Sequence, residues 1–105
     1  MELQEKIYST LANDPDFGEL VELYVDEMPE RIGSLQEVRQ ATDVEGIRRL
    51  SHQIKGSAKG YGFEIISLLA AEAERAVIDG VDSAEMFNKF DQLINALERV
   101  TAGTP

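Results

Sequence analysis

Cysteine is absent from the sequence, which excludes disulfide bonds, thiolate zinc sites and thiol nucleophiles. No apolar run approaches the roughly 20 residues that a membrane-spanning helix needs. The acidic segment Met1–Glu5 has neither the basic start nor the apolar stretch of a secretory signal peptide. We therefore expect a cytoplasmic protein, or a cytoplasmic domain of a longer one.

Basic residues are scarce, with 10 Lys and Arg against 20 Asp and Glu and a net charge of -10. Such a surface repels nucleic acid on average, so we expect no nucleic-acid partner. Four of the ten basic residues nevertheless lie between Gly46 and Phe63, a stretch without acidic residues: Arg48, Arg49, Lys55 and Lys59. This placement predicts a positive island for an anion or an acidic partner, although chance placement on a solvated helix face would give the same pattern.

The hydrophobic spacing is helical nearly throughout, and no alternating strand pattern is present. We predict helices over about 3–11, 15–41, 43–60, 63–79 and 83–101, with a kink at Pro29 inside the second. The pattern Thr42-x-x-Glu45 predicts a capping box, Asp82-x-x-Glu85 a second cap, and Gly60 with Gly62 a helix end. The expected fold is all-α: one domain, residues 1–105, forming an antiparallel four-helix bundle with a short extra N-terminal helix.

The only histidine, His52, lies within a cluster of chemically distinctive residues. Positions i, i+3, i+4 and i+7 share one helix face, so His52, Lys55, Gly56 and Lys59 form one surface patch. Gly56 costs about 1 kcal/mol relative to alanine inside a helix. Either close helix packing or clearance beside the imidazole would explain it, and Gly60 continues the same line. The patch suits a phosphoryl group carried on the imidazole, with the Lys55 ammonium pairing with its oxygens.

A nucleophilic imidazole needs its second nitrogen fixed by an acceptor, and the fourth predicted helix offers Glu72 or Glu74, between which spacing does not choose. Other chemistries fit less well. The cationic neighbours of His52 disfavour a metal site, and the sequence has no nucleotide-binding phosphate loop and no nucleophile elbow. We therefore expect no metal and no cofactor.

The segment His52–Gly62 resembles the histidine-containing phosphotransfer (HPt) domain, whose pattern is His-x-x-Lys-Gly-[Ser/Ala]-[Ser/Ala]-x-x-apolar-Gly. The similarity in helix order covers essentially residues 15–100, and the family is a four-helix bundle with the histidine exposed in mid-helix. Tyr61 departs from the pattern because it is bulkier than the usual aliphatic residue.

The resemblance implies roles for four residues. His52 is the residue phosphorylated at Nε2, Lys55 stabilises the phosphoryl group, and Gly56 gives access to it. Glu74 falls where the family carries Gln or Glu to accept the histidine's Nδ1 hydrogen, which favours it over Glu72.

The resemblance also implies the activity. The protein relays a phosphoryl group between receiver-domain aspartates, or from a sensor histidine kinase to a response regulator, without ATP-dependent kinase activity of its own. Mg²⁺ is expected on the receiver, and the protein is expected to be a monomer. Arg48, Arg49, Lys59 and Gly60 are the expected partner-binding residues.

Three alternatives stay open. The chain could be a phosphotransfer domain excised from a hybrid or chemotaxis-type kinase. It could be a module that binds or inhibits receivers without being phosphorylated, although an intact His52-Lys55-Gly56 group argues against that. A histidine-using enzyme on a small molecule would need a concave pocket at His52.

Overall fold

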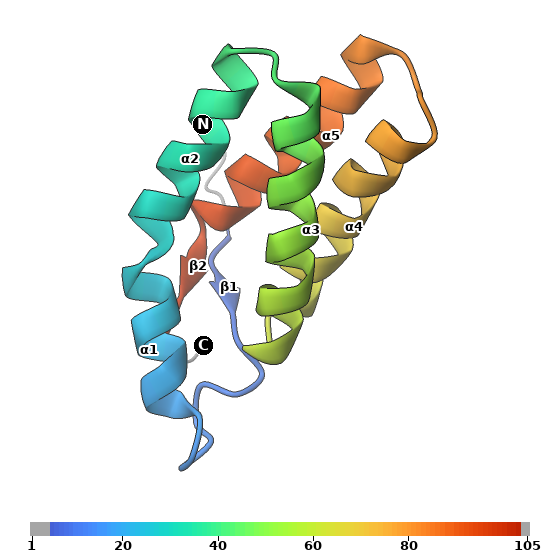
Figure 1. Cartoon of the computed structure of the whole chain (residues 1–105). Coiled ribbons are helices and arrows are strands. Elements are labelled where there is room, and N and C mark those ends of the chain that lie inside the picture. The colour runs from blue at the N-terminus through green and yellow to red at the C-terminus, as the bar shows by residue number, and fades with distance from the viewer. Residues whose placement is uncertain (1–4, 104–105) are drawn as a thin grey trace.

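The structure, a computed structural model, describes residues 5–103, which form helices and one pair of very short strands (Figure 1). Their order is β1 (Ile7–Tyr8), α1 (Gly18–Asp26), α2 (Met28–Gln40), α3 (Val44–Gly60), α4 (Glu64–Ile78), α5 (Ser83–Leu97) and β2 (Val100–Thr101). The predicted all-α fold is confirmed. Within residues 5–103, no helix combines the length and the apolar character needed to cross a membrane.

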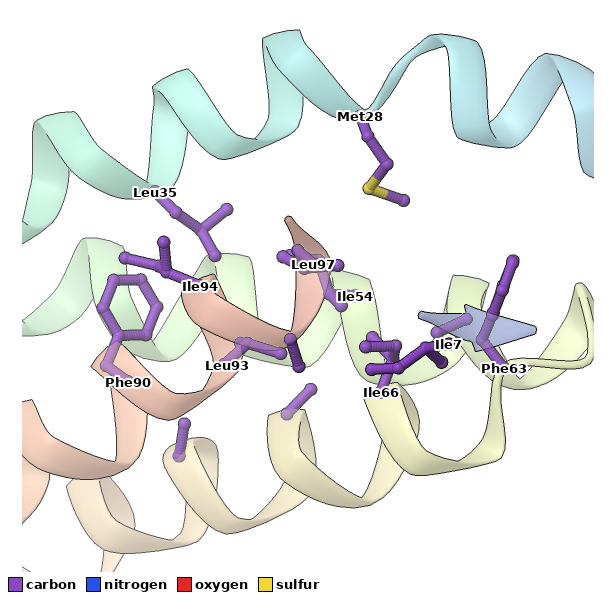
Figure 2. Packing of buried hydrophobic residues seen from close by; sticks show 14 of the residues in the cluster. Ile7, Met28, Leu35, Ile54, Phe63, Ile66, Phe90, Leu93, Ile94 and Leu97 are labelled. Atoms are coloured by element: carbon purple, nitrogen blue, oxygen red, sulfur yellow. The ribbon is translucent and has the colours of Figure 1, made fainter. Parts of the chain in front are cut away.

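Helices α2 to α5 form a closed bundle, because α3 and α5 each contact both α2 and α4 (Figure 1). The space between them is filled by large side chains from all four helices, including Leu35, Ile54, Ile66 and Phe90 (Figure 2). Helix α3 contributes Ile47, Ser51, Ile54 and Ala58 to this interior. Its opposite side, with His52, therefore faces outward.

The start of α3 differs by one residue from the predicted capping box. Asp43, not Thr42, is the N-cap, and its carboxylate accepts a hydrogen bond from the Gly46 amide at 3.0 Å. Thr42 instead turns the chain with a φ of 50°. At α5 the predicted cap is confirmed, since the Asp82 carboxylate accepts from the Glu85 amide at 3.1 Å.

The turn that follows helix α3 contains a glycine that no other residue could replace without strain. Gly62 has a φ of +81°, and the Phe63 amide behind it donates to the Ala58 carbonyl at 2.9 Å, which closes the helix end. A Cβ at Gly62 would also lie 2.5 Å from Ser9 Oγ. Gly60, predicted to help end the helix, is its last residue and stays exposed.

The predicted helix over 3–11 is wrong for its described part, and residues 3 and 4 lie outside the described residues. Ile7 and Tyr8 form β1, which pairs in parallel with Val100 and Thr101 of β2. A short isolated helix is only marginally stable in water. In the extended conformation this segment instead buries Ile7 and forms backbone hydrogen bonds to residues distant in sequence. Because Val100 and Thr101 pair with this segment, α5 ends at Leu97 instead of continuing to residue 101.

The predicted helix over 15–41 is two helices, α1 and α2, separated at Glu27. Pro29 lies in the first turn of α2, where the missing amide hydrogen has no intrahelical acceptor to lose. The predicted single helix is thus interrupted at one residue, Glu27, whose backbone keeps right-handed angles with a φ of -84° and a ψ of -6°.

Candidate functional site

His52 lies in the middle of α3, on the side that faces away from the bundle interior. Its side chain is 63% exposed. Lys55, Gly56, Lys59 and Gly60 follow on the same side of the helix. The structure therefore brings together the patch that the helical spacing predicts.

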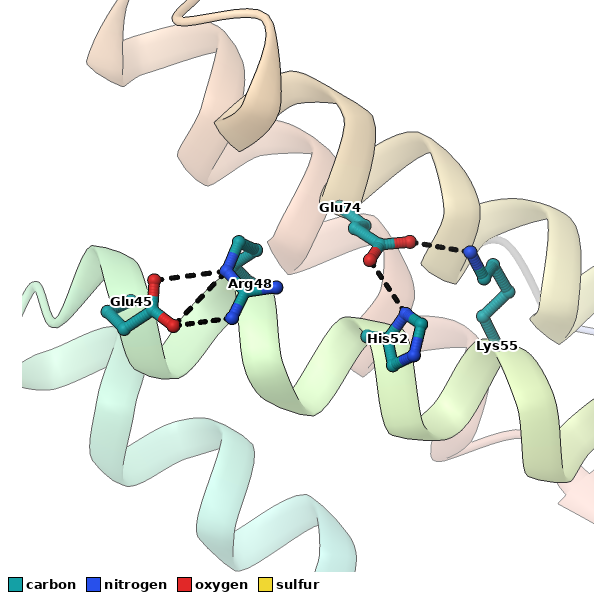
Figure 3. Close-up of polar contacts among 5 residues, drawn as sticks. All are labelled: Glu45, Arg48, His52, Lys55 and Glu74. Atoms are coloured by element: carbon teal, nitrogen blue, oxygen red, sulfur yellow. Dashed lines mark hydrogen bonds and ion pairs between the residues drawn. The ribbon is translucent and has the colours of Figure 1, made fainter.

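Helix α4 supplies a carboxylate that contacts two members of this patch (Figure 3). One oxygen of Glu74, Oε2, lies 2.8 Å from His52 Nδ1, and the other, Oε1, lies 2.7 Å from Lys55 Nζ. The Glu74 side chain is only 10% exposed. Glu72, the other candidate, instead has its Oε2 atom 3.9 Å from Lys89 Nζ of α5. Spacing did not choose between these two glutamates, and the geometry selects Glu74 as the neighbour of His52.

The Glu74 carboxylate is ionised at neutral pH. Its hydrogen bond with Lys55 lowers its pKa below the ordinary value of 4.5, burial opposes this shift, and the hydrogen bond with His52 adds to it. An ionised carboxylate can only accept hydrogen bonds, so Nδ1 of His52 carries the hydrogen between the two groups. In the neutral ring, Nε2 then holds the free electron pair, and within residues 5–103 it has no hydrogen-bond partner.

The two glycines beside His52 are not explained by packing. A Cβ built at Gly56 or at Gly60 would meet no atom within 4 Å. Of the two explanations open at the level of sequence, close helix packing therefore fails. What the glycines provide is uncovered surface along the His52 side of α3, with Gly56 one turn from the imidazole.

The predicted positive island is weaker in space than along the sequence. Arg48 is held by Glu45, with Nε 3.0 Å from Oε2, and Lys55 is held by Glu74 (Figure 3). In the described part of the chain, Arg49 and Lys59 form no ion pair. The acid-free stretch of α3 is thus partly neutralised by acids just before it and on α4.

Sequence reasoning missed two features of α4. Ile65 and Leu68 are exposed large apolar residues of this helix, and the exposed fraction of Leu68 is 66%. Leu68, Glu64 and Ser67 line a shallow depression of about 260 Å³ with Lys59 of α3. In addition, Ser67 Oγ donates a hydrogen bond of 2.8 Å to the Lys55 carbonyl. The one signal for this contact is that Ser67 lies seven residues before Glu74, on the same face of α4.

Tyr61, the departure from the family pattern, is accommodated by an aromatic partner. Its ring stacks on Tyr24 with centroids 4.3 Å apart, and the Tyr24 hydroxyl lies 2.8 Å from Ser57 Oγ.

As for metals, residues 5–103 contain no group of three or more His, Cys, Asp or Glu side chains able to hold an ion.

The family model of the Hpt domain matches residues 19–103. Neither the search of curated proteins nor that of solved structures gives a significant match. The match spans most of the chain, which therefore belongs to the Hpt family. Members of this family take part in histidine phosphotransfer in two-component phosphorelays, as carriers rather than kinases, and interact with receiver domains and kinases.

Proposed function

We propose that this chain is a phosphocarrier in which His52 Nε2 receives a phosphoryl group and passes it on. The donor is the phosphoaspartate of a receiver domain or the phosphohistidine of a sensor kinase, and the acceptor is a receiver aspartate. The observation that carries this proposal is the imidazole itself: Nδ1 is 2.8 Å from a buried carboxylate, while the ring is 63% exposed. One nitrogen is thereby oriented and the other is free to react.

In the forward step the electron pair of Nε2 forms an N–P bond as the P–O bond to the donor aspartate breaks. The bonding pair leaves with the aspartate, which becomes a carboxylate. The hydrogen on Nδ1 stays in place, so the phosphorylated ring carries a positive charge that the Glu74 carboxylate stabilises. The return step reverses these changes with a second receiver aspartate, and positioning provides most of the rate enhancement.

Lys55 has a second task in this proposal. Its ammonium carries three hydrogens on a flexible chain and is now bound to Glu74 at 2.7 Å. When a phosphoryl group arrives on Nε2, two further hydrogens are available to its oxygens without loss of the Glu74 contact. Lys55 thus stabilises negative charge on phosphorus.

Partner docking uses the uncovered side of α3. Gly56 and Gly60 leave room for the receiver's reactive end, and Arg49, Lys59 and the partly paired Arg48 complement its acidic pocket. Mg²⁺ is supplied by the receiver, and the carrier itself holds no cofactor and has no ATP-dependent kinase activity. We propose that it acts as a monomer.

The test is phosphoryl transfer from a panel of ³²P-labelled receiver domains to the parent protein and to His52→Gln. Label should appear on the parent within seconds to minutes, be lost in acid and be kept in base, as for phosphohistidine. His52→Gln should take up none, because the reacting nitrogen is gone, while a binding assay still detects the receiver. Equal labelling of the two proteins would overturn the proposal, as would a parent that binds receivers but is never labelled by them or by a histidine kinase.

A further inference from the structure

Helix α4 holds α3 at two points that lie two turns apart on the same face of α4, Ser67 and Glu74. Glu74 binds the side chains of His52 and Lys55. Ser67 binds the backbone of α3 instead, at the carbonyl of Lys55. The residue that would stabilise the phosphoryl group is therefore fixed through both its side chain and its main chain.

The Ser67 bond has good geometry for its kind. The hydroxyl oxygen lies 2.8 Å from the Lys55 carbonyl oxygen, in partly buried surroundings. A carbonyl has two lone pairs, so this one can accept from Ser67 in addition to its intrahelical donor. The hydroxyl thus joins α4 to α3 without disturbing the helix.

The peptide group that Ser67 contacts precedes a residue with no side chain to anchor it. Gly56 follows Lys55, and a Cβ at Gly56 would meet no atom within 4 Å. Glycine also has the largest backbone freedom of any residue. Ile54 and Ala58 hold this part of α3 from the interior, and on the outer side Ser67 binds the carbonyl that precedes Gly56.

We propose that Ser67 is a positioning residue for phosphoryl transfer at His52. Its hydroxyl holds the Lys55–Gly56 peptide, and through it keeps Lys55 and His52 aligned with Glu74. The inference rests on the proposed function of His52 and assigns to the reaction a residue that touches neither the imidazole nor the lysine side chain.

The experiment compares the parent with Ser67→Ala, Ser67→Thr and the control Asp82→Ala. Asp82 caps α5 outside the His52 site, so its loss should lower stability without touching α3. His52 is phosphorylated with phosphoramidate, a small donor that needs no docking surface. We expect Ser67→Ala to react about two- to tenfold more slowly, the factor that one neutral hydrogen bond corresponds to. Ser67→Thr should restore the rate, and Asp82→Ala should leave it unchanged.

A second measurement needs no phosphorylation. In ¹⁵N NMR spectra of the unmodified protein, the ring nitrogens of His52 report the Nδ1–H contact with Glu74. Ser67→Ala should shift these signals, whereas Ser67→Thr and Asp82→Ala should not.

The outcomes separate this inference from the proposed function. Unchanged His52 signals together with a parent-like rate in Ser67→Ala would overturn the positioning role, even if the parent is phosphorylated normally. An equal rate loss in Asp82→Ala would also overturn it, because stability alone would then explain the effect. If the parent takes no phosphoryl group from any donor, the proposed function fails, and the shifted signals in Ser67→Ala still support local positioning.

Discussion

Helix α3 has two glycines in opposite surroundings, Gly46 near its start and Gly56 one turn after His52. A Cβ at Gly46 would lie 2.6 Å from Asp43 Oδ2 and 2.8 Å from Val38 Cγ1. A Cβ at Gly56 would meet no atom within 4 Å. The first glycine is required by the packing of α2 and by the cap of α3, while no contact in the described part of the chain requires the second.

This difference separates two reasons for placing glycine in a helix. At Gly46 the fold itself benefits, because any side chain would displace the capping carboxylate. At Gly56 the fold gives up helix stability and receives no contact in return. A residue that costs stability without serving the packing is best explained by a partner that must come close.

The largest effect is expected when the open site at Gly56 is filled by the substitution Gly56→Leu. We expect transfer from a receiver domain to fall by about 100-fold, because the leucine displaces the approaching active site. The stability of the protein should rise, since leucine is a better helix former than glycine. Transfer kinetics and urea unfolding measure the two effects.

Phosphoramidate serves as the control for Gly56→Leu, because this donor is small enough to pass the new side chain. It should label the variant nearly as fast as the parent. Equal loss with both donors would mean that Gly56 shapes the imidazole site rather than the approach to it.

The contacts of Glu74 with the exposed side of α3 should make the stability of the protein depend on pH in the acid range. The pKa of Glu74 is lowered from 4.5, mainly by Lys55, so its contribution to stability is complete above pH 4.5 and is lost as the pH falls through the lower, folded-state value. Glu74→Gln should therefore be less stable than the parent by about 1–2 kcal/mol at pH 7 and by progressively less below pH 4.5. Denaturant titrations across this range measure the difference.

Glu72→Gln is the matched control for the acid experiment. Glu72 is exposed and 3.9 Å from Lys89, so the substitution should change stability by less than about 0.5 kcal/mol at any pH. A constant gap between Glu74→Gln and the parent down to pH 3 would contradict the ionised Glu74 contacts.

Alanine at Gly46 and alanine at Gly56 should change stability with opposite signs. Gly46→Ala should lower the free energy of unfolding by about 1 kcal/mol, because the Asp43 cap is displaced. Gly56→Ala should raise it by about 0.5–1 kcal/mol, the ordinary gain of alanine over glycine. Urea unfolding of both variants checks the signs, and a loss of stability in Gly56→Ala would refute the open surroundings of this site.

Ser51, the neighbour of His52 that faces the interior, offers the smallest effect. Its hydroxyl is fully buried and has no hydrogen-bond partner among residues 5–103. Ser51→Ala should therefore leave the protein as stable as the parent or more stable by up to about 1 kcal/mol, with phosphoryl transfer unchanged. A marked loss of stability would indicate that the hydroxyl has a partner after all.

Local patterns in the sequence predicted the bundle and the patch well. Helix α3 was placed within a residue at its start and ended at Gly60 as expected, because its apolar stripe and its terminal glycines are both encoded within the segment. The proximity of His52 and Lys55 likewise follows from helix geometry alone.

Contacts between elements distant in sequence were the part that local patterns could not predict. The bond from Ser67 to Lys55 depends on how α4 is rotated against α3, and the rotation is decided by the whole core. The pairing of Ile7 with Val100 joins a segment that precedes α1 to one that follows α5 in the sequence. The residues around each of them contain no pattern that predicts this pairing.

That strand pair has a consequence for how the protein folds. Two parallel strands can pair only after the connecting chain has turned back, and here the connection is the bundle itself. The loop that the pair closes is almost as long as the described chain, so its entropic cost must be met before the two backbone segments can meet. We therefore expect the helices to assemble first and the two strands to pair last, on a bundle that has already formed.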